Sequence, residues 1–278
     1  MMKNQHQIIF SIFKCIVVVN CASSDLRDIL LKIFGAMQVT DPSKSADIIF
    51  HIKYSATDSN QIIISREGGS DLITNDIGEF IFLFEKDMTI ELQKLRPDLL
   101  FIHSAALEYR GKALLIVAPS GTGKSTTSWA MINSGFNYLS DELAPIDIAT
   151  MSIHPYHHAL CLKAKPPVFE LPENTLFTSQ TIHVPCDSFH LAELTAVKAV
   201  FYLEYVADIN EPEIIPINTA ESAANLYANS LNILAHGEND NGLGVAIKVA
   251  SKLTSFKLKS NDLEKTCSAV KLLMNTIN

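Results

Sequence analysis

Apolar residues follow two spacings that alternate along the chain: short continuous runs, and stretches in which they recur every three or four positions. In the first part of the chain, the continuous runs predict strands at residues 15–19, 47–54 and 61–66. The helical spacing predicts helices over residues 24–34, 77–84 and 88–94, with Ser24 or Asp25 capping the first. Residues 1–95 are therefore expected to form a small α/β accessory domain.

The tripeptide Arg96-Pro97-Asp98 interrupts this pattern and marks the expected junction with a second domain over residues 96–278. Strands are predicted there at residues 99–108, 113–117, 136–140 and 196–206, with a hairpin turn at 109–112. Helices are predicted at residues 125–134, 219–234 and 261–275, the second of them capped by Thr219. The glycine-rich segment 237–244 is typical of an exposed loop. The pattern as a whole indicates an α/β fold.

Residues 118–125 read Ala-Pro-Ser-Gly-Thr-Gly-Lys-Ser and lie between a predicted strand and a predicted helix. This is the setting of a phosphate-binding loop, in which small residues let backbone N–H groups surround a polyphosphate at a helix N-terminus. Lys124 would reach the β- and γ-phosphate oxygens, and the Ser125 hydroxyl would ligate Mg²⁺. Ala118 replaces the first glycine of the pattern, which a negative φ tolerates. The residues expected to hold the nucleotide are Ser120, Gly121, Thr122, Gly123, Lys124, Ser125 and Thr126.

Asp141 and Glu142 end the strand predicted at 136–140, a position where sites commonly lie in open α/β sheets. One carboxylate would hold Mg²⁺ while the other accepts the substrate proton, the two acidic roles in phosphoryl transfer. A solvated acidic pair is the alternative interpretation. His103 lies in an apolar strand, where a histidine is either a satisfied core residue or part of a site beside the neighbouring phosphate loop.

Two segments, HSAALEYRGKALLIVAPSGTGKST at 103–126 and GFNYLSDE at 135–142, resemble the catalytic core of the HPr kinase/phosphorylase family and its HPr-kinase-like relatives. The nucleotide fold of that family is similar to phosphoenolpyruvate carboxykinase, so the resemblance implies a P-loop kinase core after the small N-terminal domain. It implies Asp141 as the catalytic base with His103 as its partner, and Lys124 at the phosphates of ATP. Ser125 and Glu142 would hold Mg²⁺.

Two features depart from this family. Glu142 stands where the family usually has a second aspartate, although its longer carboxylate still suits a hard cation. No arginine follows Arg110, so the family's arginine-containing second signature is missing, and the later chain cannot supply an arginine finger. Lys163, Lys165, an earlier arginine or another subunit would have to provide that charge. HPr as the substrate, and phosphorylase activity, are left open.

The composition indicates a globular chain. Of its 278 residues 47% are hydrophobic and 19% charged, and the formal net charge of −8 argues against a general nucleic-acid or anionic-membrane surface. The five cysteines include no CxxC pair, which favours a reducing cytoplasm over a disulfide framework or a zinc site. No segment has the roughly 18 apolar residues of a membrane span. The histidines at 154, 157 and 158 predict a turn or strand edge instead of a metal site.

Three functions are compatible with the sequence. The first is a cytoplasmic kinase that uses ATP and Mg²⁺ to phosphorylate a serine hydroxyl of a protein or peptide; HPr-kinase-like relatives include enzymes that tailor ribosomally made peptides such as lasso peptides. The second is a regulator that binds nucleotide without transferring phosphate, and the third is a small-molecule or carboxykinase-like enzyme. Asp141 favours catalysis, because a binding module needs no base. The sequence does not identify the acceptor, the role of residues 1–95 or any homo-oligomer.

Overall fold

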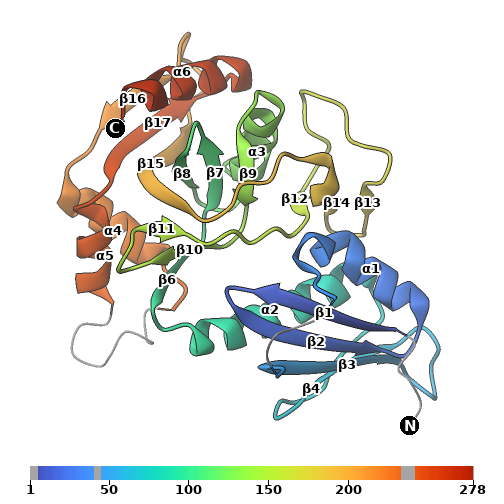
Figure 1. Ribbon diagram of the computed structural model, residues 1–278. Helices are drawn as coiled ribbons and strands as arrows, with labels where there is room; N and C mark the ends of the chain where they lie inside the picture. Colours follow the sequence, from blue (N-terminus) through green and yellow to red (C-terminus); the bar gives the residue numbers. More distant parts are fainter. Residues whose placement is uncertain (1–5, 41–44, 233–241, 278) are drawn as a thin grey trace. The chain divides into compact units, whose positions relative to one another are not determined.

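The computed structural model describes residues 6–40, 45–232 and 242–277 and shows a mixed α/β protein (Figure 1). The chain divides into two compact units. The first comprises Met1–Arg96, His157–Lys165 and Leu171–Ser188, and the second comprises Pro97–Tyr156, Pro166–Glu170 and Phe189–Asn278. The division at Arg96 lies beside the expected junction, but the first unit also includes two later segments that the sequence analysis placed in the second domain. Residues 237–241 of the expected loop lie outside the described residues.

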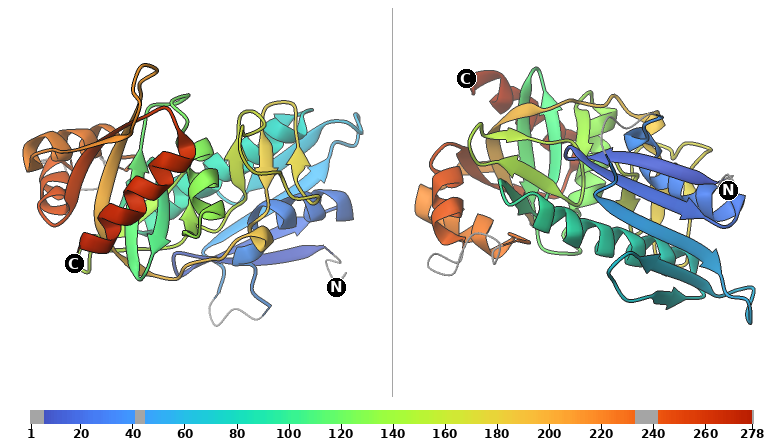
Figure 2. Two further views of the ribbon diagram at one scale, coloured as in Figure 1. Left: turned by 90° about the horizontal axis from the view of Figure 1, so that it is seen from above. Right: turned by 60° about the horizontal axis from the view of Figure 1, so that its bottom comes forward.

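A five-stranded sheet of order β1-β2-β3-β4-β5 forms the centre of the first unit. Its strands β2 and β3 are parallel and the other neighbours antiparallel (Figure 2). The helix α1 and the 3-10 turn η1 connect β2 to β3, and α2 follows β5. The bounds are β1 (Gln7–Ile12), β2 (Cys15–Cys21), α1 (Ser24–Phe34), η1 (Gly35–Met37), β3 (Ile48–Tyr54), β4 (Ile62–Arg66), β5 (Leu72–Thr74) and α2 (Ile77–Leu95).

Four phenylalanines form a core between this sheet and its helices. Phe10 of β1 and Phe50 of β3 lie at buried positions of strands in which burial alternates, so both point to one face. Phe84 of α2 packs against Phe50 at a centroid distance of 4.9 Å and against Phe34 of α1 at 5.5 Å. All four rings are fully buried, which makes their removal from water a large stabilising contribution to this unit.

The later segments of the first unit form a three-stranded antiparallel sheet of order β12-β14-β13. Two hydrogen bonds connect them to the N-terminal part: Ala159 N–H donates to the Ile33 carbonyl, and the Ser179 hydroxyl donates to Asp76, each at 2.7 Å. These contacts are among those that connect the later segments with the N-terminal part. The bounds are β12 (Leu160–Leu162), β13 (Leu176–Phe177), β14 (Ile182–Val184) and the 3-10 turn η2 (Cys186–Ser188).

The second unit is built on a sheet whose main path is β6-β10-β11-β15-β8-β7-β9, with β17 also pairing to β15 and β16 to β17. The long strand β15 is parallel to both β8 and β17. The strands are β6 (Leu99–Ile102), β7 (Ala105–Tyr109), β8 (Lys112–Val117), β9 (Asn137–Ser140), β10 (Ala144–Asp147), β11 (Ser152–Ile153), β15 (Thr195–Tyr205), β16 (Glu213–Pro216) and β17 (Thr254–Ser260). The helices are α3 (Lys124–Asn133), α4 (Thr219–Ala228), α5 (Leu243–Ala250) and α6 (Leu263–Thr276).

The strand β8 is buried along its length, as expected for a central strand. Ala113, Leu115 and Val117 on one of its faces share a core with apolar residues of α4 and α5. The helix α3 contacts β7 and β8 and is itself contacted by α6. β8, which leads into the loop at 118–123, is therefore packed against helices of this unit.

Several expected elements have other bounds. The strand expected at 99–108 is two strands, because the chain pairs with β10 up to Ile102 and with β8 from Ala105. The two helices expected at 77–84 and 88–94 are one continuous helix, α2. The helix expected at 219–234 ends at Ala228, and Asn229 accepts a backbone hydrogen bond from His103 instead.

The expected caps are each displaced by one or two residues. Ser23, and not Ser24 or Asp25, is the N-cap of α1, and it makes no side-chain cap hydrogen bond. Asn218, and not Thr219, caps α4, and its side chain accepts from the backbone N–H of Glu221. In both helices the expected capping residue is already the first helical residue or the one after it.

Candidate functional site

Three chain segments meet at one edge of the second unit's sheet. Because β7 is antiparallel to β8 and β9 is antiparallel to β7, the ends of β8 and β9 and the beginning of β7 lie at the same edge. The predicted phosphate loop follows β8, the acidic pair follows β9, and His103 precedes β7. The strand order therefore brings together the three motifs that are separate in the sequence.

The loop at 118–123 has the backbone conformation that its glycines permit. Gly121 and Gly123 have φ values of 88° and 97°, which a residue with a side chain adopts only with strain. A Cβ added at either position would meet nothing within 4 Å, so the backbone angle and not space requires glycine there. Ala118 is not among the described residues with positive φ, as its replacement of a glycine requires.

The helix α3 begins at Lys124, directly after Gly123 as its N-cap. The first N–H groups of a helix have no partner within it and carry the positive end of the helix dipole, which favours an anion at this point. Ser125 and Thr126 lie half-buried in the first turn, while Ser120 is exposed in the loop. The positive end of the helix dipole and these hydroxyl side chains therefore lie at the same end of α3.

The Lys124 side chain is only 7% exposed and points to the segment after β9. Its ammonium donates a hydrogen bond to the Asp141 carbonyl oxygen and lies 3.4 Å from Glu142 Oε2. A lysine at this depth requires such oxygen partners, because an isolated buried ammonium is costly. The structure thus places the predicted phosphate-binding lysine within contact distance of both members of the acidic pair.

His103 contacts the second acid of the pair. Its Nε2 lies 2.9 Å from Glu142 Oε2, and its backbone N–H donates to the Asn229 carbonyl at 2.8 Å. The family resemblance implied His103 as the partner of Asp141, and that role stays a prediction. The side-chain contact that the structure shows for His103 is with Glu142, which follows the end of β9 at Ser140.

Asp141 is fully buried, and the Tyr138 hydroxyl donates a hydrogen bond to its Oδ1 at 3.2 Å. Tyr138 is also fully buried and packs against Phe189 with the ring centroids 5.1 Å apart. The sequence analysis did not identify Tyr138 as a site residue. Its position on β9, three residues before the acid, was the available signal.

The histidine group at 154, 157 and 158 divides between the two units, since His154 belongs to the second and His157 and His158 to the first. All three side chains are buried. His158 Nδ1 lies 3.6 Å from Glu85 Oε1 on α2. Over the described ranges 6–40, 45–232 and 242–277, no group of three or more histidine, cysteine or acidic side chains is arranged to hold a metal ion.

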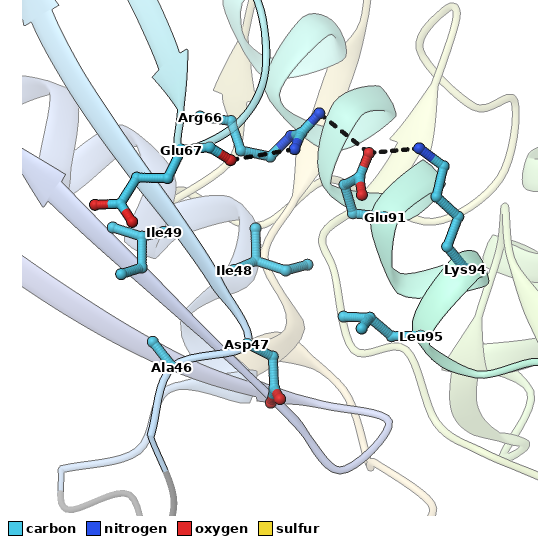
Figure 3. A pocket seen from close by; sticks show the side chains of 9 residues that line it. All are labelled: Ala46, Asp47, Ile48, Ile49, Arg66, Glu67, Glu91, Lys94 and Leu95. Atoms are coloured by element: carbon cyan, nitrogen blue, oxygen red, sulfur yellow. Dashed lines mark hydrogen bonds and ion pairs between the residues drawn. The ribbon is translucent and has the colours of Figure 1, made fainter.

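A cavity of about 330 Å³ lies in the first unit, apart from all of the predicted site residues (Figure 3). It is lined by Ala46, Asp47, Ile48, Ile49, Arg66, Glu67, Glu91, Lys94 and Leu95. Both of its cations turn to Glu91, at 3.1 Å from Arg66 and 2.8 Å from Lys94 (Figure 3). Because these charges are already compensated by a carboxylate, the cavity is poorly suited to a phosphate.

Comparisons with known proteins give a distant likeness. No protein-family model matches the chain, and no curated protein matches its sequence. Among solved structures, the HPr(Ser) kinase/phosphatase from Coxiella burnetii is similar with a TM-score of 0.33 and 13% sequence identity, over 63% of this chain and 88% of that one. None of the described helices is both long and apolar enough to cross a membrane. A likeness this distant leaves the function to be inferred from the chain's own residues.

Proposed function

We propose that the chain is a kinase that binds a purine nucleoside triphosphate with Mg²⁺ through residues 118–125 and transfers the γ-phosphoryl group to a hydroxyl. The acceptor we propose is a serine of a protein or peptide. One observation carries the proposal: the Lys124 ammonium, at the start of α3, converges with Glu142 and the Asp141 carbonyl at the edge where the glycine-containing loop lies. This is the combination of fixed positive charge and acidic groups that phosphoryl transfer requires.

The nucleotide-binding role rests on the loop and the first turn of α3. Positive φ at Gly121 and Gly123 supports a loop whose N–H groups face a common ligand. The Lys124 ammonium would exchange its contact with Glu142 for phosphate oxygens. Ser125 and Glu142 would be the Mg²⁺ ligands, and the ion would neutralise charge on the transferred group.

The base would be Asp141. Its carboxylate is removed from water and oriented by Tyr138, which keeps one oxygen engaged and the acid in one position. His103 would orient the Glu142 carboxylate, because its Nε2 contacts the same oxygen that lies beside the Lys124 ammonium. In this assignment the two acids have separate roles, proton acceptance and metal binding.

A nucleotide-binding regulator is the second candidate, and one observation favours it. No arginine follows Arg110, so no later residue of this chain can act as an arginine finger on the transferred oxygens. Such a protein would bind nucleotide through the same loop. The bound nucleotide would control association with a partner protein, and no phosphate would be transferred.

The two candidates are separated by incubating the full chain with γ-labelled ATP, Mg²⁺ and lysate fractions, followed by mass spectrometry for phosphoserine. The kinase proposal expects labelled peptides with the wild-type chain. It expects a reduction of about 10²–10⁴-fold with Asp141→Asn, the usual contribution of a positioned base. Asp208→Asn, an exposed aspartate of the same unit, is the matched control. Nucleotide binding without any labelled product would support the regulator instead.

A further inference from the structure

A second cluster of reactive side chains belongs to the three-stranded sheet of the first unit. Cys161 on β12 and His183 on β14 are direct partners across two antiparallel strands. Directly paired residues project to the same face, and Cys161 Sγ lies 3.2 Å from His183 Nδ1. The strand register itself therefore fixes the distance between the thiol and the imidazole.

Two threonines lie beside Nε2 of His183, the ring nitrogen that does not face the thiol. The Thr178 hydroxyl donates to the Thr181 carbonyl at 2.9 Å, which uses its single proton. Thr181 Oγ1 lies 3.3 Å from Thr178 Oγ1 and 2.8 Å from His183 Nε2. When the imidazole carries a proton on Nε2, Thr181 Oγ1 accepts from Nε2–H. In that tautomer the lone pair of Nδ1 is directed at the thiol, and the same acceptor stabilises the imidazolium that forms when the thiol proton moves to Nδ1.

The exposure of the cysteines distinguishes Cys161 from the others. Cys161 is partly exposed, whereas the remaining four, Cys15, Cys21, Cys186 and Cys267, are buried. Burial raises the pKa of the Cys21 thiol to about 12 and also raises the pKa of Cys267, which makes both poor nucleophiles. A reagent in solution therefore meets Cys161 first.

The charged groups around this position come from two sources. The strands β12, β13 and β14 contain no acidic residue, and β13 places the apolar Leu176 opposite His183. The acidic side chain that contacts the loop between β13 and β14 is Asp76, the N-cap of α2, which accepts from the Ser179 hydroxyl. The charged residues that follow β12 are Lys163 and Lys165, both exposed. Nearby positive charge favours the thiolate form of a cysteine.

We propose that Cys161 is a histidine-activated thiol and the site at which this chain undergoes thiol–disulfide exchange with small disulfides. The proton of Cys161 moves to His183 Nδ1, and the thiolate attacks one sulfur of a disulfide. A new bond forms between Cys161 Sγ and that sulfur while the original disulfide bond breaks. The departing thiolate takes the proton from the imidazolium, so that a mixed disulfide and one free thiol result.

The first test is the pH dependence of alkylation at each cysteine of the full chain, measured with iodoacetamide and peptide mass spectrometry. An ordinary thiol with a pKa of about 8.5 reacts about tenfold more slowly for each pH unit below that value. Cys161 is expected to keep its plateau rate at least about one unit lower. A profile like that of an ordinary thiol overturns the proposal, and this result needs no variant to fold.

The second test assigns the activation to the histidine. His183→Gln should slow alkylation of Cys161 by about tenfold near pH 6.5, while Thr181→Val should have a smaller effect in the same direction. His51→Gln, at an exposed histidine of the same unit, should leave the rate unchanged. With glutathione disulfide, the added mass should appear on the Cys161 peptide of the wild-type chain and be lost in Cys161→Ser. Equal rates in wild type and a folded His183→Gln chain, or labelling spread over all cysteines, overturn the proposal.

Discussion

The Lys124 ammonium lies 3.4 Å from the Glu142 carboxylate, and the two side chains differ sharply in exposure, 7% against 39%. Exposed ion pairs contribute about 0–1 kcal/mol, and the half-exposed Glu142 places this pair near that range, although the buried ammonium still needs an anionic partner. In the proposed nucleotide complex, phosphate oxygens would replace Glu142 as that partner. The ion pair holds the Lys124 ammonium in position, and the ammonium could exchange Glu142 for another anion.

Glu142→Gln should change nucleotide binding in opposite directions with and without metal. Without Mg²⁺, removing the competing carboxylate should tighten ATP binding by up to about fivefold, the equivalent of about 1 kcal/mol for the lost pair. With Mg²⁺, the concentration of metal needed for transfer should rise, because a neutral oxygen replaces a charged ligand. A Mg²⁺ titration of ATP affinity and of single-turnover transfer measures both effects. Glu204→Gln, at an exposed position of β15, is the control, and identical curves for the two variants would refute the metal-ligand role.

Tyr138→Phe removes the hydroxyl that donates to Asp141 and retains the ring that packs on Phe189. Because a buried carboxylate loses a hydrogen bond, the free energy of unfolding should fall by about 1–3 kcal/mol in a urea titration. Transfer should also slow while ATP affinity stays the same, since the tyrosine acts through the base. Tyr227→Phe on α4 controls for loss of a half-buried phenol. Unchanged stability together with unchanged transfer would show that the tyrosine does not position Asp141.

Asp76 connects the stability of the first unit to pH. The Ser179 hydroxyl, followed by the backbone N–H of Glu79, lowers the pKa of this carboxyl. Because the pKa of Asp76 is lower in the folded than in the unfolded chain, the ionised carboxylate stabilises the fold at pH values above about 4. This stabilisation is lost as the pH falls further, through the pKa of the folded state. In Asp76→Asn the amide still caps α2, so the variant should be less stable than wild type at neutral pH and approach it near pH 3 or so. Urea titrations at the two pH values measure this convergence, and a constant difference would contradict it.

Removal of residues 1–96 should give a poorly soluble protein. The deletion leaves β12 and β14 without the unit in which Leu160, Leu162 and Val184 are buried. Exposed apolar strands of this kind favour aggregation. Size-exclusion chromatography of the shortened chain tests this, and a second deletion that also removes residues 157–188 should behave better. A monodisperse product from the first deletion would mean that the later segments belong with the second unit.

The spacing of apolar residues predicted an element well where the element's structure depends mainly on neighbouring residues in the sequence. The helix α1 has the bounds that its apolar spacing predicted, and the hairpin between β7 and β8 turns at Arg110 and Gly111, both with positive φ, as expected. Elements whose structure depends on a distant partner were predicted less well. Among the charged residues that interrupted the pattern of α2, Lys86 is exposed, but Glu85 and Asp87 are partly buried, and Asp87 binds Arg66 at 2.6 Å. That pairing cannot be read from the spacing of apolar residues.

The same limit applies to the candidate site. Motif spacing was sufficient to group Lys124 with the acidic pair, because strands of one sheet bring their ends to a shared edge. It could not show that His103 binds Glu142, since that contact depends on the turn after β9. Tyr138 was missed because a tyrosine in a hydrophobic strand looks like an ordinary core residue until its hydroxyl partner is known.

The most direct test of the account is calorimetric titration of Mg·ATP into the wild-type chain, Lys124→Ala and Lys252→Ala. Lys252 is an exposed lysine of the same unit and serves as the matched control. Wild type and Lys252→Ala should show the same saturable binding. Lys124→Ala should bind about tenfold or more weakly, because charge-assisted hydrogen bonds to phosphate oxygens are lost. Equal affinity in all three proteins, or no binding by the wild-type chain, would contradict the assignment of residues 118–125 as a nucleotide site.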